Sequence, residues 1–192
     1  MVGFRGKYSY DGNGNQTLQV TGYNSSQPDT TIFTYDGDGN LIQQVDPDGH
    51  TTDYSYDAQG DQIEEIDGAG SSNPGTTHDY YDGNGNLTLS VNAVSDSTVY
   101  GYDADGNQTL EIDGYGTSSA ATTRYVYDAA GNQIEEIDPD GNTTSYEYDA
   151  DGNQTLMIQA VGTKVQASTS YQYDKDGNLT LQTNPNLSLI HI

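Results

Sequence analysis

A six-residue motif recurs eight times along the chain, and this regular self-similarity constrains the fold more than any other feature of the sequence. The copy Tyr148-Asp149-Ala150-Asp151-Gly152-Asn153 shows the pattern: Tyr-Asp, two small or polar residues, Gly, then Asn. The copies begin at Tyr10, Tyr35, Tyr56, Tyr81, Tyr102, Tyr127, Tyr148 and Tyr173. Steps of 25 and 21 residues alternate between them and define a unit of 46 residues. The sequence therefore predicts a tandem array.

The motif has the composition of a tight turn. Asp149 suits the first position of a type I turn, and Gly152 supplies the left-handed residue that follows. This is typical of the three-residue hairpin loop that ends in a bulge. A second series, Asp46–Gly49 and Asp138–Gly141, carries a proline that presets φ for the turn. Turns 10 or 11 residues apart leave about six residues for each strand, so we expect an antiparallel meander of about sixteen strands.

Most turns are preceded by Tyr-x-Tyr, as at Tyr146 and Tyr148. Residues two apart share one face of a strand, so the tyrosines should form a ladder with aromatic cross-strand pairs. The alternative is a platform on which a ligand stacks. Phe33 replaces the first tyrosine in the second copy, and the fourth copy reads Asp79-Tyr80-Tyr81, which breaks the alternation.

The strands after the turns differ in pattern. Gln108–Ile112 alternates cleanly, whereas Ile63 and Ile134 fall on the face opposite to Ile66 and Ile137. A sheet that is partly wet on both faces would tolerate this, and so would a sheet with a covering layer on each side. The packing of these strands stays open at this point.

The 25-residue steps contain longer connections rich in Gly and small polar residues, which are typical of exposed loops. Because they recur every 46 residues, they should project from one edge of the array. They are Gly22–Pro28, Gly68–Gly75, Gly114–Ala120 and Gly162–Ser168.

Charge and composition exclude several classes of function. The formal net charge is -24, with 29 acidic and 5 basic residues, and such a surface repels nucleic acid and anionic membranes. Only 32% of the residues are hydrophobic, which is also typical of disorder, but seventeen tyrosines at regular positions argue for a folded chain. There is no cysteine, and no apolar run is long enough to span a membrane. The first residues lack the apolar core of a signal peptide, as expected of an internal fragment.

Catalysis finds little support in the sequence. His50, His78 and His191 have no repeated nucleophile beside them, and the carboxylates recur at equivalent positions, which suits turn chemistry rather than one acid–base pair. Metal binding is an alternative, because Asp103, Asp105 and Asn107 place oxygen ligands at alternate positions. An EF-hand loop fails here, since its glycine and glutamate positions are not matched. We expect no cofactor and no specific metal site beyond weak binding of calcium.

The eight copies resemble the RHS/YD repeat, and the resemblance covers about residues 8–183. Proteins of that family include bacterial polymorphic toxins, Tc toxin subunits, wall-associated proteins and teneurins. The resemblance implies a β-sheet spiral that builds a hollow shell, which in bacteria encloses a toxic C-terminal domain. It also implies a structural role for the residues of the motif. They are Tyr10, Asp11, Gly14, Asn15, Tyr35, Asp36, Gly39, Asn40, Tyr56, Asp57, Gly60, Tyr81, Asp82, Gly85, Asn86, Tyr102, Asp103, Gly106, Asn107, Tyr127, Asp128, Gly131, Asn132, Tyr148, Asp149, Gly152, Asn153, Tyr173, Asp174, Gly177 and Asn178.

The chain departs from the family pattern in two ways. Asn follows the turn glycine in seven copies, where the family often has Arg, and Asp61 follows it in the third copy. The core segment that ends bacterial shells and the variable toxin domain are not in this sequence. Residues 1–183 are thus expected to be a repeat array and residues 184–192 a tail. We hypothesise that residues 187–192 are the translation of a sequencing adapter.

These observations predict an all-β array of antiparallel hairpins forming an extended, curled sheet. The expected function is a non-enzymatic wall segment of a secreted or surface bacterial protein that encapsulates a C-terminal toxin domain. Its partners would be the remaining repeats and that domain. The alternative is an extracellular carbohydrate-binding or adhesion array, assisted by calcium.

Overall fold

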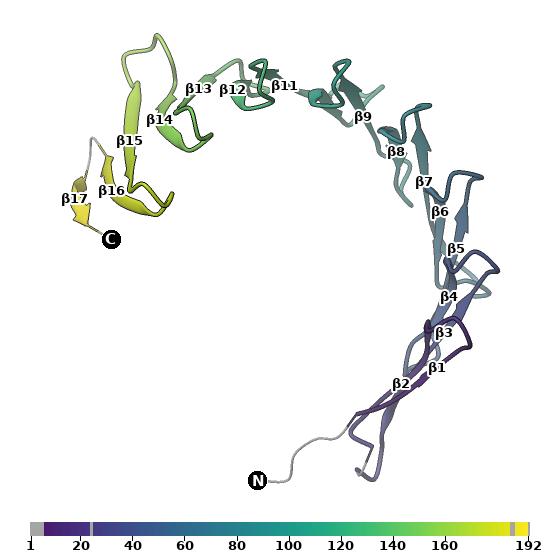
Figure 1. Cartoon of the computed structure of the whole chain (residues 1–192). Coiled ribbons are helices and arrows are strands. Elements are labelled where there is room, and N and C mark those ends of the chain that lie inside the picture. Colours follow the sequence, from purple (N-terminus) through teal and green to yellow (C-terminus); the bar gives the residue numbers. More distant parts are fainter. Residues whose placement is uncertain (1–5, 24, 185–186, 192) are drawn as a thin grey trace. The chain divides into compact units, whose positions relative to one another are not determined.

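The chain is a succession of β-strands joined by turns (Figure 1). The computed structural model describes residues 6–23, 25–184 and 187–191, and no helix occurs among them. The contacts divide the chain into two compact units, Met1–Ser97 and Thr98–Ile192. The predicted all-β class of antiparallel hairpin repeats is confirmed.

In the first unit each strand pairs antiparallel with the next one in sequence, as in a meander. The strands are β1 (Lys7–Tyr10), β2 (Gln16–Thr21), β3 (Asp29–Tyr35), β4 (Leu41–Val45), β5 (Thr51–Tyr56), β6 (Gln62–Asp67), β7 (Gly75–Tyr81) and β8 (Leu87–Val91).

The second unit repeats this meander from its first strand to its last. Its strands are β9 (Ser97–Tyr102), β10 (Gln108–Asp113), β11 (Ala121–Tyr127), β12 (Gln133–Ile137), β13 (Thr143–Tyr148), β14 (Gln154–Gln159), β15 (Ala167–Tyr173), β16 (Leu179–Asn184) and β17 (Leu187–His191). The described residues thus form seventeen strands, one more than expected, because the backbone of Leu187–His191 pairs with β16. The origin of this tail stays a prediction.

A β-bulge follows each Tyr-Asp turn and explains the irregular strands. In the hairpin of β5 and β6, Ser55 pairs with Glu64 and Tyr56 pairs with Gln62, so Ile63 is the extra residue. Ile134 is the extra residue in the same place between β11 and β12. Because a bulge inserts one residue into the alternation, these isoleucines do not follow the pattern of the strand beyond them.

The connections at the opposite edge alternate between long loops and short turns, so the long loops recur at that edge within each unit (Figure 1). Two of the short turns are the predicted proline turns. The third spans Asn92–Asp96 and closes with the same bonds without any glycine, so that Ser95 adopts a φ of 68°. Ala160, with a φ of 51°, likewise begins its loop in the left-handed region. Residues other than glycine rarely adopt this backbone conformation, so both positions carry backbone strain.

The register places the tyrosines of the Tyr-x-Tyr pattern on one face of the sheet, which we name the tyrosine face; Tyr80, where the pattern is broken, lies on the other face. Tyr146 lies opposite Met157, which lies opposite Thr169, and Tyr54, Glu65 and Thr77 form an equivalent row. The predicted aromatic cross-strand pairs are therefore wrong. Tyrosines occur in every second strand, and the strand between them contributes Gln, Glu, Ser or Met at that position.

The rows reveal a threonine column that our sequence interpretation missed. A threonine stands two residues before the Tyr-x-Tyr position in seven successive odd-numbered strands, and aligning the copies by their repeat steps would have found it. The residues are Thr31, Thr52, Thr77, Thr98, Thr123, Thr144 and Thr169.

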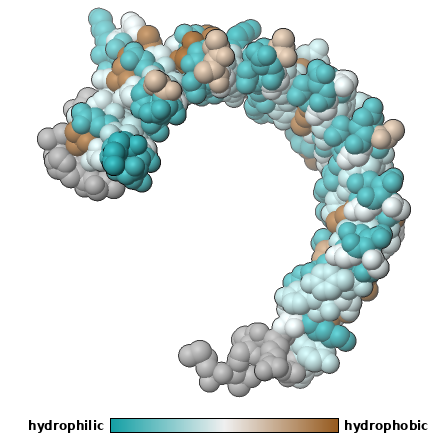
Figure 2. All heavy atoms as spheres, in the orientation of Figure 1, coloured by the Kyte–Doolittle hydropathy of each residue, from teal (hydrophilic) through white to brown (hydrophobic). Residues whose placement is uncertain are grey.

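The other face carries a column of β-branched aliphatic residues, one from each of the even-numbered strands β2 to β14: Val20, Val45, Ile66, Val91, Ile112, Ile137 and Ile158. No second layer covers either face, because Val20 and Thr169, at 8% and 5% exposure, are the only buried residues in the described part of the chain. Figure 2 shows apolar residues scattered among hydrophilic ones. Within the described residues the sheet is thus partly wet on both faces, as in the first of the two packing alternatives. Each hairpin depends on its neighbours for stability.

Candidate functional site

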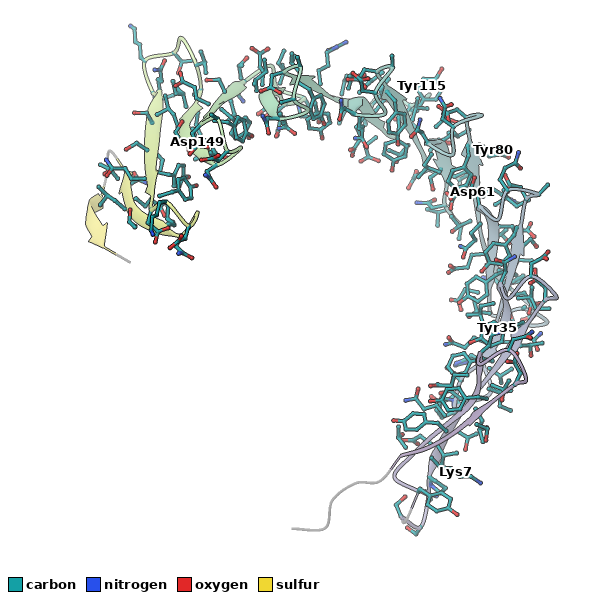
Figure 3. The ribbon with its side chains drawn as sticks, in the orientation of Figure 1. Lys7, Tyr35, Asp61, Tyr80, Tyr115 and Asp149 are labelled. Carbon is teal, nitrogen blue, oxygen red and sulfur yellow. The ribbon has the colours of Figure 1, made fainter. Side chains whose placement is uncertain are left out.

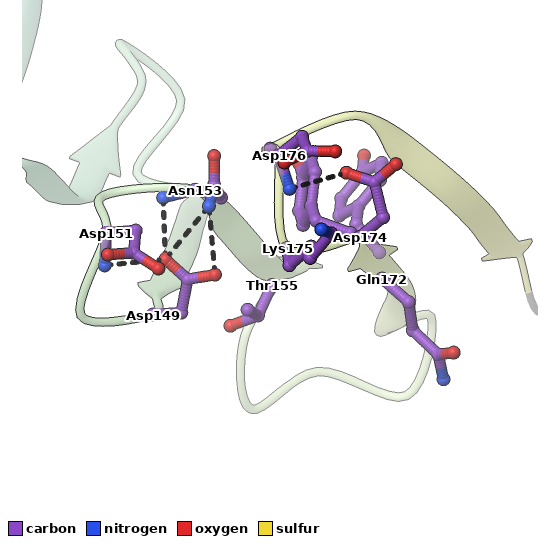
Figure 4. Close-up of a pocket in the computed structure, with 11 residues that line it drawn as sticks. Asp149, Asp151, Asn153, Thr155, Gln172, Asp174, Lys175 and Asp176 are labelled. Atoms are coloured by element: carbon purple, nitrogen blue, oxygen red, sulfur yellow. Dashed lines mark hydrogen bonds between the residues drawn. The ribbon is translucent and has the colours of Figure 1, made fainter.

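The repeated feature of the chain is the Tyr-Asp turn, and the seventh copy shows its bonding (Figure 4). The Asp149 N–H donates to the Asn153 carbonyl at 3.0 Å, and the Gly152 N–H donates to the Asp149 carbonyl at 3.1 Å. Oδ1 of Asp149 accepts the N–H groups of Asp151 at 3.0 Å and Asn153 at 2.9 Å, while Oδ2 accepts the Asn153 amide at 3.0 Å. Gly152 has a φ of +83°, which glycine adopts without strain. The geometry thus accounts for Asp, Gly and Asn in the motif.

The same bond between the Asn amide and Asp Oδ2, 3.0 Å long, occurs in six other copies: Asp11–Asn15, Asp36–Asn40, Asp82–Asn86, Asp103–Asn107, Asp128–Asn132 and Asp174–Asn178. Hydrogen bonds to the ionised carboxylate favour its charged form. The Asn153 side chain and then its backbone N–H accordingly lower the pKa of Asp149. The aspartates of the six other copies have lowered pKa values from bonds to their own asparagines.

We name the bond from the Asn amide to Oδ2 of the turn Asp the clamp. The third copy lacks it. Oδ1 of Asp57 accepts the backbone N–H groups of Gln59 and Asp61 at 2.9 and 3.0 Å, but the carboxylate of Asp61 has no N–H to donate. This turn therefore contains two carboxylates and no amide side chain at position 61. Partial burial, followed by the charges of Asp79, Asp61 and Asp57, raises the pKa of the neighbouring Tyr81.

Successive turns lie side by side within each unit. A Cβ placed on Gly177 would be 3.8 Å from Oδ1 of Asn153 in the preceding turn, and one on Gly152 would be 3.9 Å from Oδ1 of Asn132. Gly39 lies in the same way beside Asn15. The turns therefore form a column along one edge of the sheet.

A tyrosine hydroxyl joins each of four copies to the copy before it. Tyr173 donates to the Gln154 carbonyl at 2.9 Å, and Tyr148 donates to that of Gln133 at 2.8 Å. The carbonyl belongs in each case to the residue after the preceding asparagine. The same bond joins Tyr56 to Leu41 at 2.9 Å and Tyr35 to Gln16 at 3.0 Å. Figure 3 labels Tyr35 among the side chains of the first unit. This bond spans 15 or 19 residues, and no sequence signal that we used identifies its acceptor.

Open hollows lie between successive turns. One of about 670 Å³ separates the turns of Asp149 and Asp174 and is lined by Thr155, Tyr173 and Lys175 (Figure 4). Another of about 520 Å³ lies beside Asp57 and contains Glu64 and His78. The first hollow is lined largely by polar groups, whereas Ile63, Tyr80 and Tyr81 make the lining of the second more apolar than polar.

His50 and His78 each lie beside one carboxylate. In the hollow beside Asp57, Ser55 donates to Oε2 of Glu64 at 3.4 Å, and Nδ1 of His78 lies 3.6 Å from Oε1 of the same Glu64. Because Glu64 separates the hydroxyl from the imidazole, His78 is not placed to activate Ser55. His50 lies 3.4 Å from Asp46 in an exposed turn. The side chain of His191 lies outside the described residues.

The turn aspartates are engaged within their own turns, and no group of three or more His, Asp or Glu side chains that could hold a metal ion occurs in the described ranges. Asp103 and Asn107, predicted as oxygen ligands, bond to each other. Within the same residues no helix has the length and apolarity needed to cross a membrane.

Comparison with solved structures shows a shared fold. The TcdB2-TccC3-Cdc42 complex matches with a TM-score of 0.75 and 17% identity over 95% of this chain, and TcdB2-TccC3 without its hypervariable C-terminal region matches with a TM-score of 0.74 and 18% identity over 93%. The Tc holotoxin pore of Photorhabdus luminescens, with a mutation in TccC3, matches with a TM-score of 0.74 and 17% identity over 95%. The chain spans 11% of the length of each.

A sequence comparison with curated proteins finds no significant match. The family model of the RHS repeat matches residues 35–72, 81–118, 121–143 and 127–164, which together make up more than half of the chain. These segments contain the motifs and hairpins described above. The chain therefore belongs to the RHS repeat family.

Proposed function

We propose that this chain is a non-enzymatic segment of the wall of a secreted or surface-exposed bacterial RHS protein, and that the wall encapsulates a C-terminal toxin domain. The observation that carries the proposal is the joining of successive turns, through tyrosine hydroxyls in four copies and through the close approach of turn glycines to the asparagine of the preceding turn. This arrangement extends a single-layer sheet by any number of copies. It supplies an open surface without a closed core in the described residues, which suits a wall.

The membership of the RHS repeat family and the fold shared with TccC3 complexes support a shell role. The partners would be the flanking repeats, which pair with the edge strands of this segment, and the enclosed domain. Encapsulation requires that the gene continue beyond this segment.

The test is to sequence the source DNA across both ends of the reading frame and then to express the longer protein. Further Tyr-Asp repeats followed by an unrelated C-terminal domain are expected, and that domain should resist protease in the full-length protein but not when expressed alone. A stop codon after the eighth copy, with a secretion signal upstream, would contradict the wall role. It would favour a stand-alone array that binds carbohydrate or calcium, which a glycan array and calcium titration would then examine.

A further inference from the structure

Six described asparagines begin an Asn-x-Thr sequence: Asn15, Asn86, Asn107, Asn142, Asn153 and Asn178. Asn-x-Thr is the acceptor sequence of N-glycosylation. In four of them, Asn107, Asn142, Asn153 and Asn178, an aspartate stands two residues earlier, which is the extended acceptor that bacterial oligosaccharyltransferases recognise. Asn15 and Asn86 have Asn13 and Asn84 at that position instead.

The fold uses both ends of this acceptor sequence. In the seventh copy, the Asn153 amide donates to Asp149 at 3.0 Å, and Oγ1 of Thr155, the bulge residue, donates to the Glu147 carbonyl at 3.2 Å. The same two bonds occur at Asn107 with Thr109 and at Asn178 with Thr180. The amide of Asn142 donates to Asp138 at 2.8 Å in a proline turn. The groups that a glycosylating enzyme must engage are thus bonded within the hairpin.

We propose that the Tyr-Asp turn is a concealed N-glycosylation site, which is an acceptor in the extended chain and is closed when the hairpin forms. In the reaction, Nδ2 of the asparagine attacks the anomeric carbon of a lipid-linked oligosaccharide, and a bond forms between them. The bond from that carbon to the pyrophosphate breaks, the lipid pyrophosphate leaves, and Nδ2 gives up one proton to the enzyme. Nδ2 of Asn153 is held against Asp149 in the folded turn, so the hairpin must open before the enzyme can bind the asparagine.

Within the column of turns, glycosylation of an asparagine and stacking of the next turn on it exclude each other. Gly177 of the next turn lies so close to Asn153 that a single added Cβ would reach 3.8 Å from its amide oxygen, and Gly131 lies in the same way beside Asn107. A sugar on either asparagine would occupy the space of the following turn. A glycan added before folding therefore prevents these turns from stacking. Asn178 and Asn142 are exposed, whereas Asn153 and Asn107 are half-buried, so the exclusion is strongest for the latter pair. The inference is independent of the wall role.

The test incubates the intact chain, and separately synthetic fragments of it that span residues 8–20, 79–91, 100–112 and 146–158, with a bacterial oligosaccharyltransferase and a lipid-linked oligosaccharide. Separate peptides are used because residues 103–110 and 149–156 have the same sequence, and because the longer flanks distinguish them by mass. Site occupancy is measured by mass spectrometry. The fragments should be modified at Asn107 and Asn153 at least tenfold faster than the intact chain, and Asn15 and Asn86 should stay unmodified in both. Equal rates at Asn153 in the intact chain and its fragments would overturn the proposal, and so would the absence of modification in the fragments.

Two variants test separately whether the enzyme recognises the acceptor sequence and whether the folded turn keeps the enzyme from the asparagine. Thr155→Val keeps a β-branched side chain at the bulge but removes the acceptor sequence, so the Asn153 fragment should no longer be modified, while the Asn107 fragment serves as the unchanged control. Asp149→Ala removes the acceptor of the Asn153 amide, so modification of the intact chain should rise at Asn153. A rise at Asn107 as well would mean that the whole array opens, which still shows that folding closes the sites. No rise at either site would contradict closure by the turn.

Discussion

The third and seventh copies of the Tyr-Asp turn share one backbone but differ in side-chain bonding. Both close with the same pair of backbone hydrogen bonds, and Gly60 and Gly152 have φ values of +90° and +83°. Only the seventh copy has an asparagine that clamps its aspartate. The comparison shows that Asp and Gly suffice to form the turn, and that Asn adds a bond on top of it.

Other departures from the repeat pattern lie near the third copy. Asp61 replaces the clamp, and Asp79 takes the place of a tyrosine on the tyrosine face of the next strand. Tyr80 is thereby shifted to the aliphatic face, where it lies opposite Leu89 and remains 51% exposed. These changes add two carboxylates near Tyr81, whose pKa is raised by partial burial and by both of their charges.

Acidification should have the largest effect, because it removes the clamp from many turns together. Hydrogen bonds hold the pKa values of nine turn aspartates below their ordinary value of 3.8. Their stabilising contribution is present above pH 3.8 and is lost as the pH falls through the lower folded-state values. The urea midpoint followed by circular dichroism should therefore fall steeply below pH 4. A midpoint that does not change between pH 5 and pH 2.5 would contradict this linkage.

Gly152→Ala should cost roughly 1–2 kcal/mol in the free energy of unfolding, because a side chain strains the left-handed conformation. Gly60→Ala in the third copy should cost the same, since the backbone of the two turns is the same. The measurement is urea unfolding, with Gly37→Ala as the matched control, because Gly37 lies in a turn without a positive φ and has open space around its Cα. Unequal losses at Gly60 and Gly152 would show that the two turns differ in more than the clamp.

Asp61→Asn should raise the free energy of unfolding by about 1 kcal/mol, because it supplies the missing amide donor and removes one of two neighbouring carboxylates. Asn153→Asp should lower it by a similar amount in the seventh copy. Chemical denaturation of the two single variants and of the wild type measures both changes. If Asp61→Asn were neutral or destabilising, the clamp would not explain the difference between the copies.

Tyr148→Phe should cost up to about 1 kcal/mol, since it removes the hydroxyl that donates to the Gln133 carbonyl at 2.8 Å. Tyr81→Phe should have almost no effect, because the Tyr81 hydroxyl makes no such bond in the described structure. Amide exchange at the preceding turn, measured by NMR, would locate the loss. Equal effects of the two substitutions would mean that the hydroxyl bond does not join the copies.

The sequence predicts the parts of this fold that depend on near neighbours. The turns follow from Asp149 and Gly152, and the meander follows from their spacing, because these bonds close within five residues. The pairing of strands was harder to foresee. Aromatic pairs were expected from Tyr146 and Tyr148, yet the register sets Met157 and Gln154 opposite them. The bulge at Thr155 shifts that register by one residue, as the bulge at Ile63 does in the third copy, and the position of both became visible only once the pairing was known. The tyrosine hydroxyl bond joins residues of adjacent strands that lie 15 or 19 positions apart, so local pattern does not identify it.

The tyrosine hydroxyl bond gives the array a polarity. Tyr148 of one copy reaches back to Gln133 beside the copy before it, and Tyr173 reaches back to Gln154. Where this bond occurs, a hairpin is therefore held by its successor rather than by its predecessor. The chain emerges from the ribosome with its N-terminus first. A new hairpin that carries this bond would therefore stabilise the hairpin already formed, and the hairpin formed last would lack that stabilisation until the next one is made.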